Sequence, residues 1–285
     1  MPEQKITVGV VGAGTMGQGI AQVFAQAGHP VKLFDSLEGA APRAVAQIDK
    51  FLSKSVEKGK LGAEAKGQAM SCLQPVGRLE QMGDAAVAVE AVFEQLEIKK
   101  EVLQKLDAVL PPQAILATNT SSISITALAA ATKRPAWFVG MHFFNPVPLM
   151  KLVEVVVGLE TSEETVAATC RLAEAVGKTP LVVKDHPGFV SNRVLMPMIN
   201  EAIGCLAEGV ADARTIDGVM KLGCNHPMGP LELADLIGLD VCLHILEVLH
   251  RDLGEDRYRP CPLLRKMVLA GRLGRKTGRG FFEYG

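Results

Sequence analysis

The sequence predicts an α/β protein, with a doubly wound parallel-sheet domain first and an all-α domain after it. Apolar strand-like segments alternate with helix-like segments up to about residue 185, and a glycine-rich turn joins the first strand to the first helix. Beyond "KDHPGFVSNR" the strand signals fade. We therefore expect domains at residues 1–185 and 186–285, each long enough to form a core, with the active site in a cleft between them.

The first strand and helix flank three glycines in a G-x-G-x-x-G pattern. "ITVGVV" is short, apolar and β-branched, and "TMGQGIAQVFAQAG" repeats apolar residues at helical spacing. Gly12 would permit the turn, Gly14 would let a pyrophosphate approach, and Gly17 would let the helix pack on the strand. The pyrophosphate would lie at the helix N-terminus, at Thr15 and Met16. The alternative is a tight turn between two buried elements.

An acidic residue stands where a dinucleotide site requires one. The second expected strand, "VKLF", ends at Asp35, which lies 18 residues after Gly17, close to the spacing of about 20 in such sites. Its carboxylate can accept hydrogen bonds from ribose hydroxyls and would repel a 2′-phosphate. Ser36 follows instead of Arg, so NAD is favoured over NADP. Although Asp35 alone could be a surface-turn residue, the ordered series indicates a Rossmann-type NAD-binding domain.

The remaining elements continue the two patterns. The first domain is expected to contain helices at about 38–60, 95–112 and 162–178, and strands at 85–92, 114–122, 137–141, 151–158 and 179–185. The second domain is expected to contain helices at 189–210, 213–223, 229–254 and 262–274, the first kinked at Pro197.

Composition excludes several classes of function. The 285 residues are 48% hydrophobic and 21% charged with a net charge of −1, which offers no electrostatic basis for binding nucleic acid or anionic membrane. No apolar run is long enough for a transmembrane helix, and the N-terminus is no signal peptide. The six cysteines form no CxxC pair and the six histidines show no metal-binding spacing, so we expect reduced thiols, a cytoplasmic location and no metal.

Four residues match the chemistry of hydride removal from an alcohol, which needs a base, a group that fixes its tautomer and polar groups for the oxygen. His142 follows the strand at 137–141, and Glu154 interrupts the apolar strand "KLVEVVVG", where it can face back toward His142. Ser121 ends "ATNTS" and Asn192 lies in the first turn of a helix, so both are candidates for the substrate oxygen. The alternatives are a structural histidine, a solvated glutamate, turn chemistry and a helix cap.

The chain resembles the L-3-hydroxyacyl-CoA dehydrogenase family, especially its short bacterial members, the 3-hydroxybutyryl-CoA dehydrogenases. The resemblance spans nearly the whole chain and rests on "GAGTMGQGIA", "ATNTSSISIT", "GMHFFNPVPLMKLVEVV", "HPGFVSNRV", "KLGCNHPMGPLELADLIGLD" and "LGRKTGRGFFEY". It implies oxidation of an (S)-3-hydroxyacyl-CoA to the 3-ketoacyl-CoA, and the reverse. In it His142 would be the base, Glu154 its partner, and Ser121 and Asn192 contacts of the substrate oxygen.

The same resemblance implies further contacts. For the cofactor it implies Asp35, Glu94, Lys99, Asn145 and Lys276. For coenzyme A it implies Ser53 and Lys60, in the helix expected to end in "SKSVEKGK". It also implies a homodimer through the helical domain, with which the apolar helices of residues 211–270 are compatible.

Three other functions are weighed against this one. The β-hydroxyacid dehydrogenases use a catalytic lysine, and "SNRVLMP" contains none. A 3-hydroxyadipyl-CoA dehydrogenase of phenylacetate breakdown would use the same residues on another acyl group. A non-catalytic NAD-binding protein, such as a crystallin resembling this family, is disfavoured because all four catalytic positions hold competent residues. Nothing in the residues sets the acyl length, so a short chain is favoured by the resemblance alone.

Overall fold

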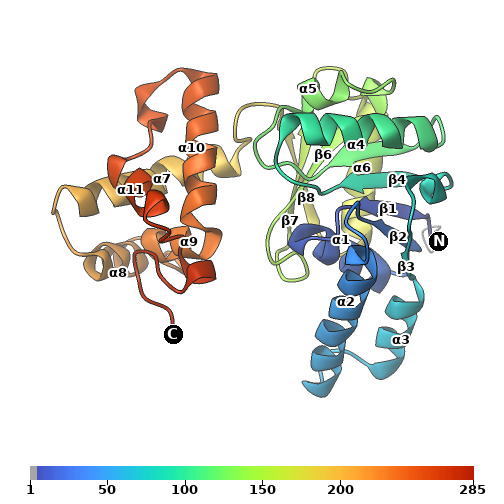
Figure 1. Cartoon of the computed structure of the whole chain (residues 1–285), viewed down its shortest axis with the longest axis horizontal. Helices are drawn as coiled ribbons and strands as arrows, with labels where there is room; N and C mark the ends of the chain where they lie inside the picture. Colours follow the sequence, from blue (N-terminus) through green and yellow to red (C-terminus); the bar gives the residue numbers. More distant parts are fainter. Residues whose placement is uncertain (1–4) are drawn as a thin grey trace. The chain divides into compact units, whose positions relative to one another are not determined.

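The computed structural model describes residues 5–285, which divide into two compact units (Figure 1). The first unit ends at Asp185 and the second begins at His186. The first is a mixed α/β unit built on one sheet, and the second is helical. The predicted fold class, a Rossmann-type domain followed by an all-α domain, is confirmed.

An eight-stranded sheet forms the centre of the first unit, in the order β3-β2-β1-β4-β5-β6-β7-β8. Strands β1 to β6 run parallel, whereas β7 is antiparallel to β6 and β8 is parallel to β7. The order reverses between β1 and β4, where doubly wound sheets bind ligands at the carboxyl ends of the strands. The strands are β1 (Val8–Val11), β2 (Val31–Phe34), β3 (Leu73–Pro75), β4 (Val87–Glu90), β5 (Ile115–Thr118), β6 (Phe138–Phe143), β7 (Leu152–Val157) and β8 (Thr179–Lys184).

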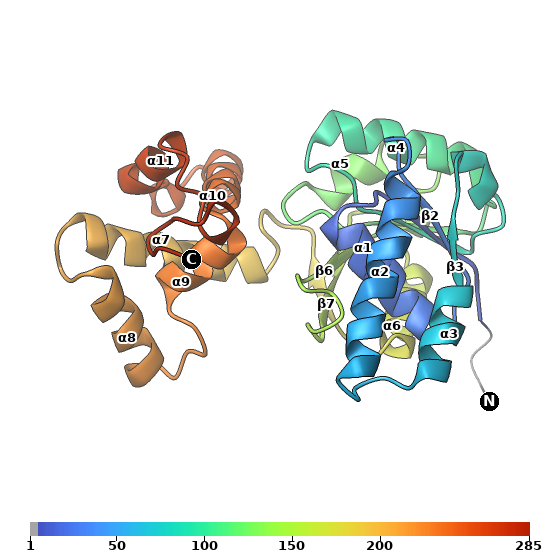
Figure 2. The ribbon, with the colours of Figure 1, turned by 60° about the horizontal axis from the view of Figure 1, so that its bottom comes forward.

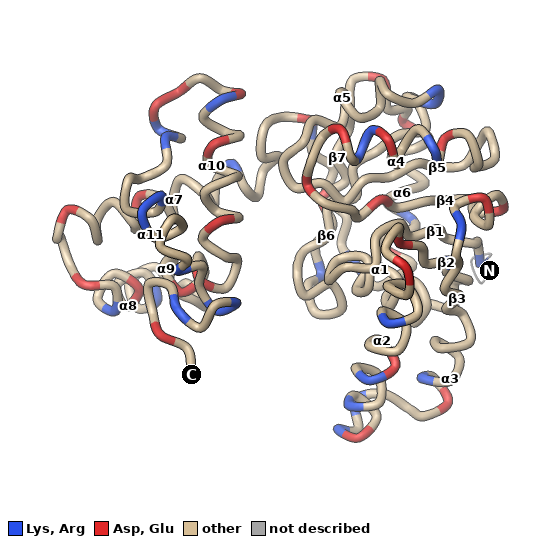
Figure 3. The backbone as a smooth tube through the Cα atoms, viewed as in Figure 1, with Lys and Arg blue, Asp and Glu red and all other residues tan. Residues whose placement is uncertain are grey.

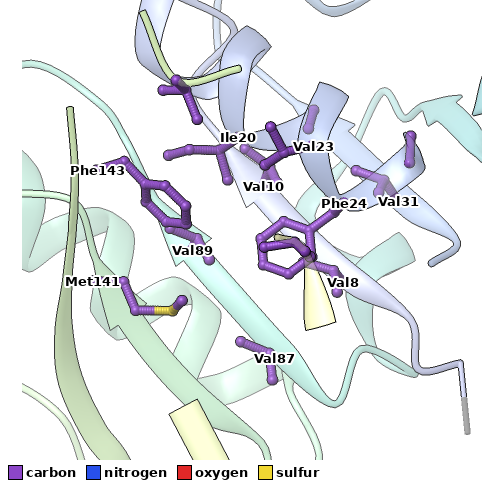
Figure 4. Close-up of a cluster of buried hydrophobic side chains, with 14 of the residues drawn as sticks. Val8, Val10, Ile20, Val23, Phe24, Val31, Val87, Val89, Met141 and Phe143 are labelled. Carbon is purple, nitrogen blue, oxygen red and sulfur yellow. The ribbon is translucent and has the colours of Figure 1, made fainter. Parts of the chain in front are cut away.

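Helices cover both faces of the sheet. Helices α1 (Thr15–Gln26), α2 (Ala40–Glu57) and α6 (Glu163–Ala175) share one core with the strands, whereas α4 (Leu96–Val109) and α5 (Ile125–Ala129) contact the sheet outside that core. Figure 4 shows Phe24 of α1 among valines of β1, β2 and β4. Phe24 is fully buried, which contributes about 1.5–3 kcal/mol. This packing fixes α1, and therefore its N-terminus, against the carboxyl end of β1.

The short elements that were not predicted from the sequence include a helix and an edge strand of the first unit. Helix α3 (Ala63–Ser71) packs beside α2 (Figure 2), and β3 follows it at the edge of the sheet. The segment "AEAKGQAMS" shows no repeat of apolar residues at helical spacing that would have predicted a helix. In the structure it buries a single residue, Ala69. Pro75 ends β3, and an edge strand tolerates a proline because one side of its backbone needs no ladder partner.

The expected helix at 38–60 was too long at both ends. Gly39 adopts a left-handed conformation just before α2, with φ of +72°, and the helix ends at Glu57. Gly59 is also left-handed, so Lys60 lies in the turn that leads to α3 and not in the helix.

The second unit contains five helices among the described residues: α7 (Ser191–Ala207), α8 (Ala213–Gly223), α9 (Pro230–Ile237), α10 (Leu239–Leu253) and α11 (Pro262–Leu269). The single helix expected at 229–254 was wrong, because Gly238 has φ of +106° and separates α9 from α10. Leu239, Cys242 and Leu246 of α10 are buried in the core of this unit. Within residues 5–285, no helix combines the length and apolarity needed to cross a membrane.

Candidate active site

The glycine turn has the geometry that a dinucleotide requires. Gly12 has φ of +105°, and a Cβ there would lie 2.4 Å from the carbonyl oxygen of Ala91. A Cβ on Gly17 would lie 1.7 Å from the carbonyl oxygen of Gly12, so only glycine lets α1 approach the end of β1 this closely. Gly14 faces open space, with no atom within 4 Å of its virtual Cβ. Gly14 and Thr15 are exposed, leaving room for a pyrophosphate at the start of α1.

Asp35 is one of the residues that line a cavity of about 480 Å³ at the end of β2. Its carboxylate accepts hydrogen bonds from the backbone N–H groups of Ala13, at 2.7 Å, and Leu37, at 2.8 Å. The lining includes the acidic side chains Asp35 and Glu38 and no lysine or arginine. The guanidinium of Arg43, one turn into α2, donates to the backbone oxygen of Glu38. An acidic lining suits ribose hydroxyls and opposes a 2′-phosphate, so the residues present fit NAD.

His142 and Glu154 form a buried pair across two antiparallel strands. They are register partners in β6 and β7, and Nδ1 of His142 lies 2.7 Å from Oε2 of Glu154. Their side chains are 9% and 3% exposed. A carboxylate only accepts hydrogen bonds, so Nδ1 carries the proton and donates it, which leaves the lone pair of the neutral ring on Nε2. The ring of Phe144 lies 4.5 Å from the imidazole, centroid to centroid.

A buried ion pair lies at the end of β4. Glu90 and Lys99 of α4 are 0% and 1% exposed, and Nζ of Lys99 donates to Oε1 of Glu90 at 2.7 Å. The other oxygen of Glu90 accepts a 2.7 Å hydrogen bond from the hydroxyl of Thr118, which ends β5. Lys99 also donates to the backbone oxygen of Val92 at 3.2 Å. Lys99 was predicted as a cofactor contact, and its ammonium is directed into this network inside the protein.

Glu94 links this network to the loop that carries Ser121. Its Oε1 accepts hydrogen bonds from the hydroxyl of Thr120 and from the N–H and hydroxyl groups of Ser121 and Ser122, at 2.6 to 3.2 Å. Its Oε2 lies 3.3 Å from Nζ of Lys99. Burial raises the pKa of Glu94, but the Lys99 ammonium and the hydrogen bonds from Thr120 and Ser121 outweigh it and hold the pKa below its usual value. The ionised carboxylate therefore organises the serine loop.

Two predicted site residues belong to the second unit. Asn192 is buried, 8% exposed, in the first turn of α7. Lys276 lies in a 3₁₀ turn, Arg275–Thr277, and its ammonium contacts the carboxylate of Asp240 at 2.6 Å. The segment after that turn is held by buried Asp235, which accepts hydrogen bonds from the N–H groups of Phe281 and Phe282 and from the hydroxyl of Tyr284. Burial, with this hydrogen bond, raises the pKa of Tyr284 to about 12.

Comparison with known proteins decides the family. The family model described as "3-hydroxyacyl-CoA dehydrogenase, NAD binding domain" matches residues 7–186. The model for the C-terminal domain of the same family matches residues 188–284. The chain belongs to the 3-hydroxyacyl-CoA dehydrogenase family. It is therefore an oxidoreductase with an NAD-binding domain, as the sequence predicted.

Relatives of this dehydrogenase match it nearly end to end. A probable 3-hydroxybutyryl-CoA dehydrogenase of Deinococcus radiodurans is 56% identical over 276 residues, covering 97% of this chain and 99% of the relative. The solved structure of (S)-3-hydroxybutyryl-CoA dehydrogenase PaaH1 from Ralstonia eutropha has a TM-score of 0.96 at 48% identity, covering 99% of this chain and all of that one. A 3-hydroxyadipyl-CoA dehydrogenase of Escherichia coli is 45% identical over 98% of this chain, and the match spans 59% of that relative.

The two residues expected to contact coenzyme A in this dehydrogenase do not line the cavity that α2 forms with α1. Ser53 accepts a 2.8 Å hydrogen bond from Lys66 of α3, and Lys60 is exposed in the following turn (the charged tip of α2 is visible in Figure 3). A cavity of about 430 Å³ is instead lined by other residues of α2, Phe51 and Ser55. Its remaining lining comes from α1 and the segment after β6, and comprises Thr15, Gln18, Gly19, Gln22, Asn145, Pro146, Val147, Pro148 and Leu149. Asn145, an expected cofactor contact, thus lies on a cavity wall.

Sequence reasoning missed several residues that support the dehydrogenase site. Glu90 interrupts the apolar run "AAVAVEAV" as Glu154 interrupts its own strand, so the same signal could have found it. The amide oxygen of Asn119 accepts a 2.9 Å hydrogen bond from the backbone of Phe143 and ties the end of β5 to that of β6. No sequence pattern marks Phe51 or Ser55, because their place at the cavity depends on how α2 packs. Among the described residues, no group of three or more potential metal ligands lies together.

Proposed function

We propose that the protein oxidises the 3-hydroxyl group of an (S)-3-hydroxyacyl-CoA to the ketone with NAD, and catalyses the reverse reduction. The observation that carries this proposal is the His142–Glu154 pair, with a 2.7 Å hydrogen bond that selects the tautomer of a general base. It lies in the sheet whose β1–α1 turn has the geometry for a dinucleotide.

The proposed mechanism assigns one role to each residue. Nε2 of His142 takes the proton from the substrate hydroxyl, and Glu154 stabilises the imidazolium that forms. Ser121 and Asn192 are proposed to bind the substrate oxygen, as the family resemblance implies. The chemistry that bound NAD would supply is acceptance of a hydride from C3 of the substrate. In the reverse direction His142 returns its proton to the oxygen.

The residues proposed to hold NAD differ in the kind of contact they make. Gly12, Gly14 and Gly17, with Thr15 and Met16, would hold the pyrophosphate, and Asp35 would accept hydrogen bonds from the adenosine ribose. Asn145 and Lys276 are proposed as further contacts. For Glu94 and Lys99 we propose an indirect role in holding the cofactor. Glu94 acts through the serine loop that it holds, and Lys99 acts through Glu94, because its ammonium is 1% exposed.

We propose a short acyl group, of which 3-hydroxybutyryl-CoA is the leading case. Support comes from the names of the relatives that match nearly end to end at 48% and 56% identity. The cavity at Phe51 and Ser55 is a candidate site for part of the coenzyme A arm, and its lining contains no lysine or arginine. Ser53 and Lys60 remain candidates for the phosphates at the outer end of α2.

We further propose a homodimer through the helical unit, in the cytoplasm. Val219 and Leu222 of α8 and Leu269 of α11 are large apolar side chains with 60%, 92% and 87% exposure, which favours burial against a second copy. All six cysteines lie in the described part of the chain as free thiols, which suits a reducing compartment. Sedimentation velocity of the purified protein tests the dimer, and a concentration-independent monomer contradicts it.

The decisive experiment is the loss of NADH absorbance on addition of acetoacetyl-CoA, with NADPH and 3-oxoadipyl-CoA run in parallel. We expect rapid oxidation of NADH with acetoacetyl-CoA and a much slower reaction with NADPH. Preference for 3-oxoadipyl-CoA would favour the second candidate, a 3-hydroxyadipyl-CoA dehydrogenase, which the 45% identical relative from Escherichia coli supports. NADH binding without turnover on either substrate would contradict the proposal and favour a non-catalytic NAD-binding protein.

A further inference from the structure

The loop between β6 and β7 forms one wall of the cavity that lies against α1 and α2. Residues 145–150, here called the 145–150 loop, begin with Asn145, and five of these six residues line the cavity. Leu149 is 76% exposed, so the outer part of the loop receives little support from the core. Two backbone N–H groups, of Leu149 and Met150, donate to the carbonyl of Pro146. These internal bonds fold the loop but do not attach it to the rest of the unit.

One attachment is the side chain of Val147, which is 3% exposed. It packs against α1 at Gly19, where an added Cβ would lie 2.7 Å from the Cβ of Val147. Gly19 is thus a notch that receives this side chain. The contact fixes the depth of the loop over α1 but is apolar and leaves its carbonyl groups to other partners.

The second attachment is Lys178, which directly precedes β8. Its Nζ donates to the backbone oxygens of Val147, at 2.5 Å, and Met150, at 2.8 Å. Lys178 is 8% exposed, and in residues 5–285 no carboxylate lies within 4.0 Å of its ammonium. Burial lowers the pKa of this ammonium, which means that the protein bears a cost to keep a charge here. A methionine would fill similar space without that cost, so the benefit lies in joining the two carbonyls.

We propose that Lys178 is a positioning residue for the dehydrogenase reaction, acting through the 145–150 loop. Its ammonium donates to the carbonyls of Val147 and Met150, which flank Pro148 and Leu149 of the cavity wall. The inference rests on the proposed function for its kinetic consequence. A displacement of about 1 Å in a positioning element can cost roughly a hundredfold in rate. Because two hydrogen bonds from Lys178 hold this loop, we expect loss of the lysine to lower turnover.

The test compares Lys178→Met with Lys184→Met, in the wild-type full-length enzyme background. Lys184 lies at the other end of β8 and is exposed, so its variant controls for loss of a lysine from this strand. We expect Lys178→Met to lower kcat/KM for acetoacetyl-CoA by roughly 10- to 100-fold, with a higher KM, and Lys184→Met to match wild type. Wild-type kcat and KM in Lys178→Met overturn the proposal, even if its melting temperature falls.

A second variant keeps the proposal testable if Lys178→Met does not fold. Gly19→Ala places a Cβ against the side chain of Val147, and alanine is favoured over glycine inside a helix. We expect it to raise KM in the same way, and wild-type kinetics in this variant would count against the loop as the positioning element.

Hydrogen exchange separates this proposal from the proposed function, because it needs no substrate. The amides of Leu149 and Met150 are expected to exchange faster in Lys178→Met than in wild type and in Lys184→Met. Unchanged exchange at both amides overturns the role of Lys178 whatever the substrate proves to be. Faster exchange in an enzyme whose wild type does not reduce acetoacetyl-CoA would leave the loop contact established and contradict the assigned reaction.

Discussion

Two carboxylates in the first unit invite comparison, because the sequence presents them alike and the structure uses them differently. Glu90 of β4 and Glu154 of β7 each interrupt an apolar strand, and their side chains are 0% and 3% exposed. Glu154 is paired with a histidine, whose charge can change near neutral pH. Glu90 is paired with the ammonium of Lys99, and lysine is not a residue type that ordinarily exchanges its proton near neutral pH.

The partner therefore decides what a buried carboxylate does. Beside His142, Glu154 is matched to a group that gains and loses a proton during a reaction. Beside Lys99, Glu90 forms an ion pair that ties β4, β5 and α4 together and positions Glu94. The comparison predicts that variants at the first pair affect mainly activity, whereas variants at the second affect mainly stability.

The largest effect is expected for His142→Gln. Removing the base should lower turnover by roughly 10²–10⁴-fold, with NADH affinity and melting temperature close to wild type, because the glycine turn and the cores are untouched. Steady-state kinetics and NADH fluorescence titration measure the two quantities. The matched control is His244→Gln, at an exposed position of α10, which should keep full activity. Near-normal turnover in His142→Gln would remove this histidine from the mechanism.

Glu90→Gln should show the opposite profile. It leaves the buried Lys99 ammonium with Glu94, 3.3 Å away, as its remaining counter-charge, so we expect the free energy of unfolding to fall by about 3 kcal/mol, the lower end of the cost of breaking a buried ion pair. Urea denaturation measures this fall, and adding Lys99→Met should recover part of it, because the buried ammonium that lost Glu90 is then gone. If Glu90→Gln is as stable as wild type and simply inactive, the distinction between the two carboxylates fails.

A smaller effect, on nucleotide binding, is expected for a variant of Asp35. This carboxylate follows the end of β2 and lines a cavity, whereas Glu90 and Glu154 each face a side chain that can carry a positive charge. Asp35→Ser removes the acceptor for ribose hydroxyls and the charge that opposes a 2′-phosphate. We expect NADH affinity to fall by roughly tenfold, consistent with about 1.5 kcal/mol for a hydrogen bond to a charged group, while NADPH binding improves. Fluorescence titration with both nucleotides measures this, and unchanged selectivity would mean that another group reads the ribose.

The smallest effect concerns the pH dependence of stability through Glu94. Its pKa in the folded protein lies below its usual value of 4.5, so the unfolded chain binds this proton more readily. The stabilisation is therefore complete above about pH 4.5 and is lost as the pH falls through the lower, folded pKa. Wild type should lose stability more steeply than Glu94→Gln in this acidic range. Parallel slopes in denaturant titrations at several pH values would show that Glu94 gains nothing from Lys99 and the serine loop.

Local patterns in the sequence determined the fold class, the glycine turn and the carboxylate at the end of β2. Strand and helix periods, glycines and charges in apolar runs are properties of short segments, and each restricts the backbone nearby. The family resemblance added the candidate roles of the residues. The overlong helix at 38–60 and the undivided helix at 229–254 were wrong because a local period does not reveal which glycine adopts a left-handed conformation.

The tertiary structure decided which residues meet. The antiparallel pairing of β7 with β6 puts Glu154 opposite His142, and a shift of one residue would have turned either side chain to the other face. The packing of α4 buries Lys99 against Glu90, and the packing of α2 turns Ser53 toward Lys66 and Phe51 toward the cavity. These contacts join residues far apart along the chain, and their register comes from the cooperative packing of the whole unit, which no single segment encodes.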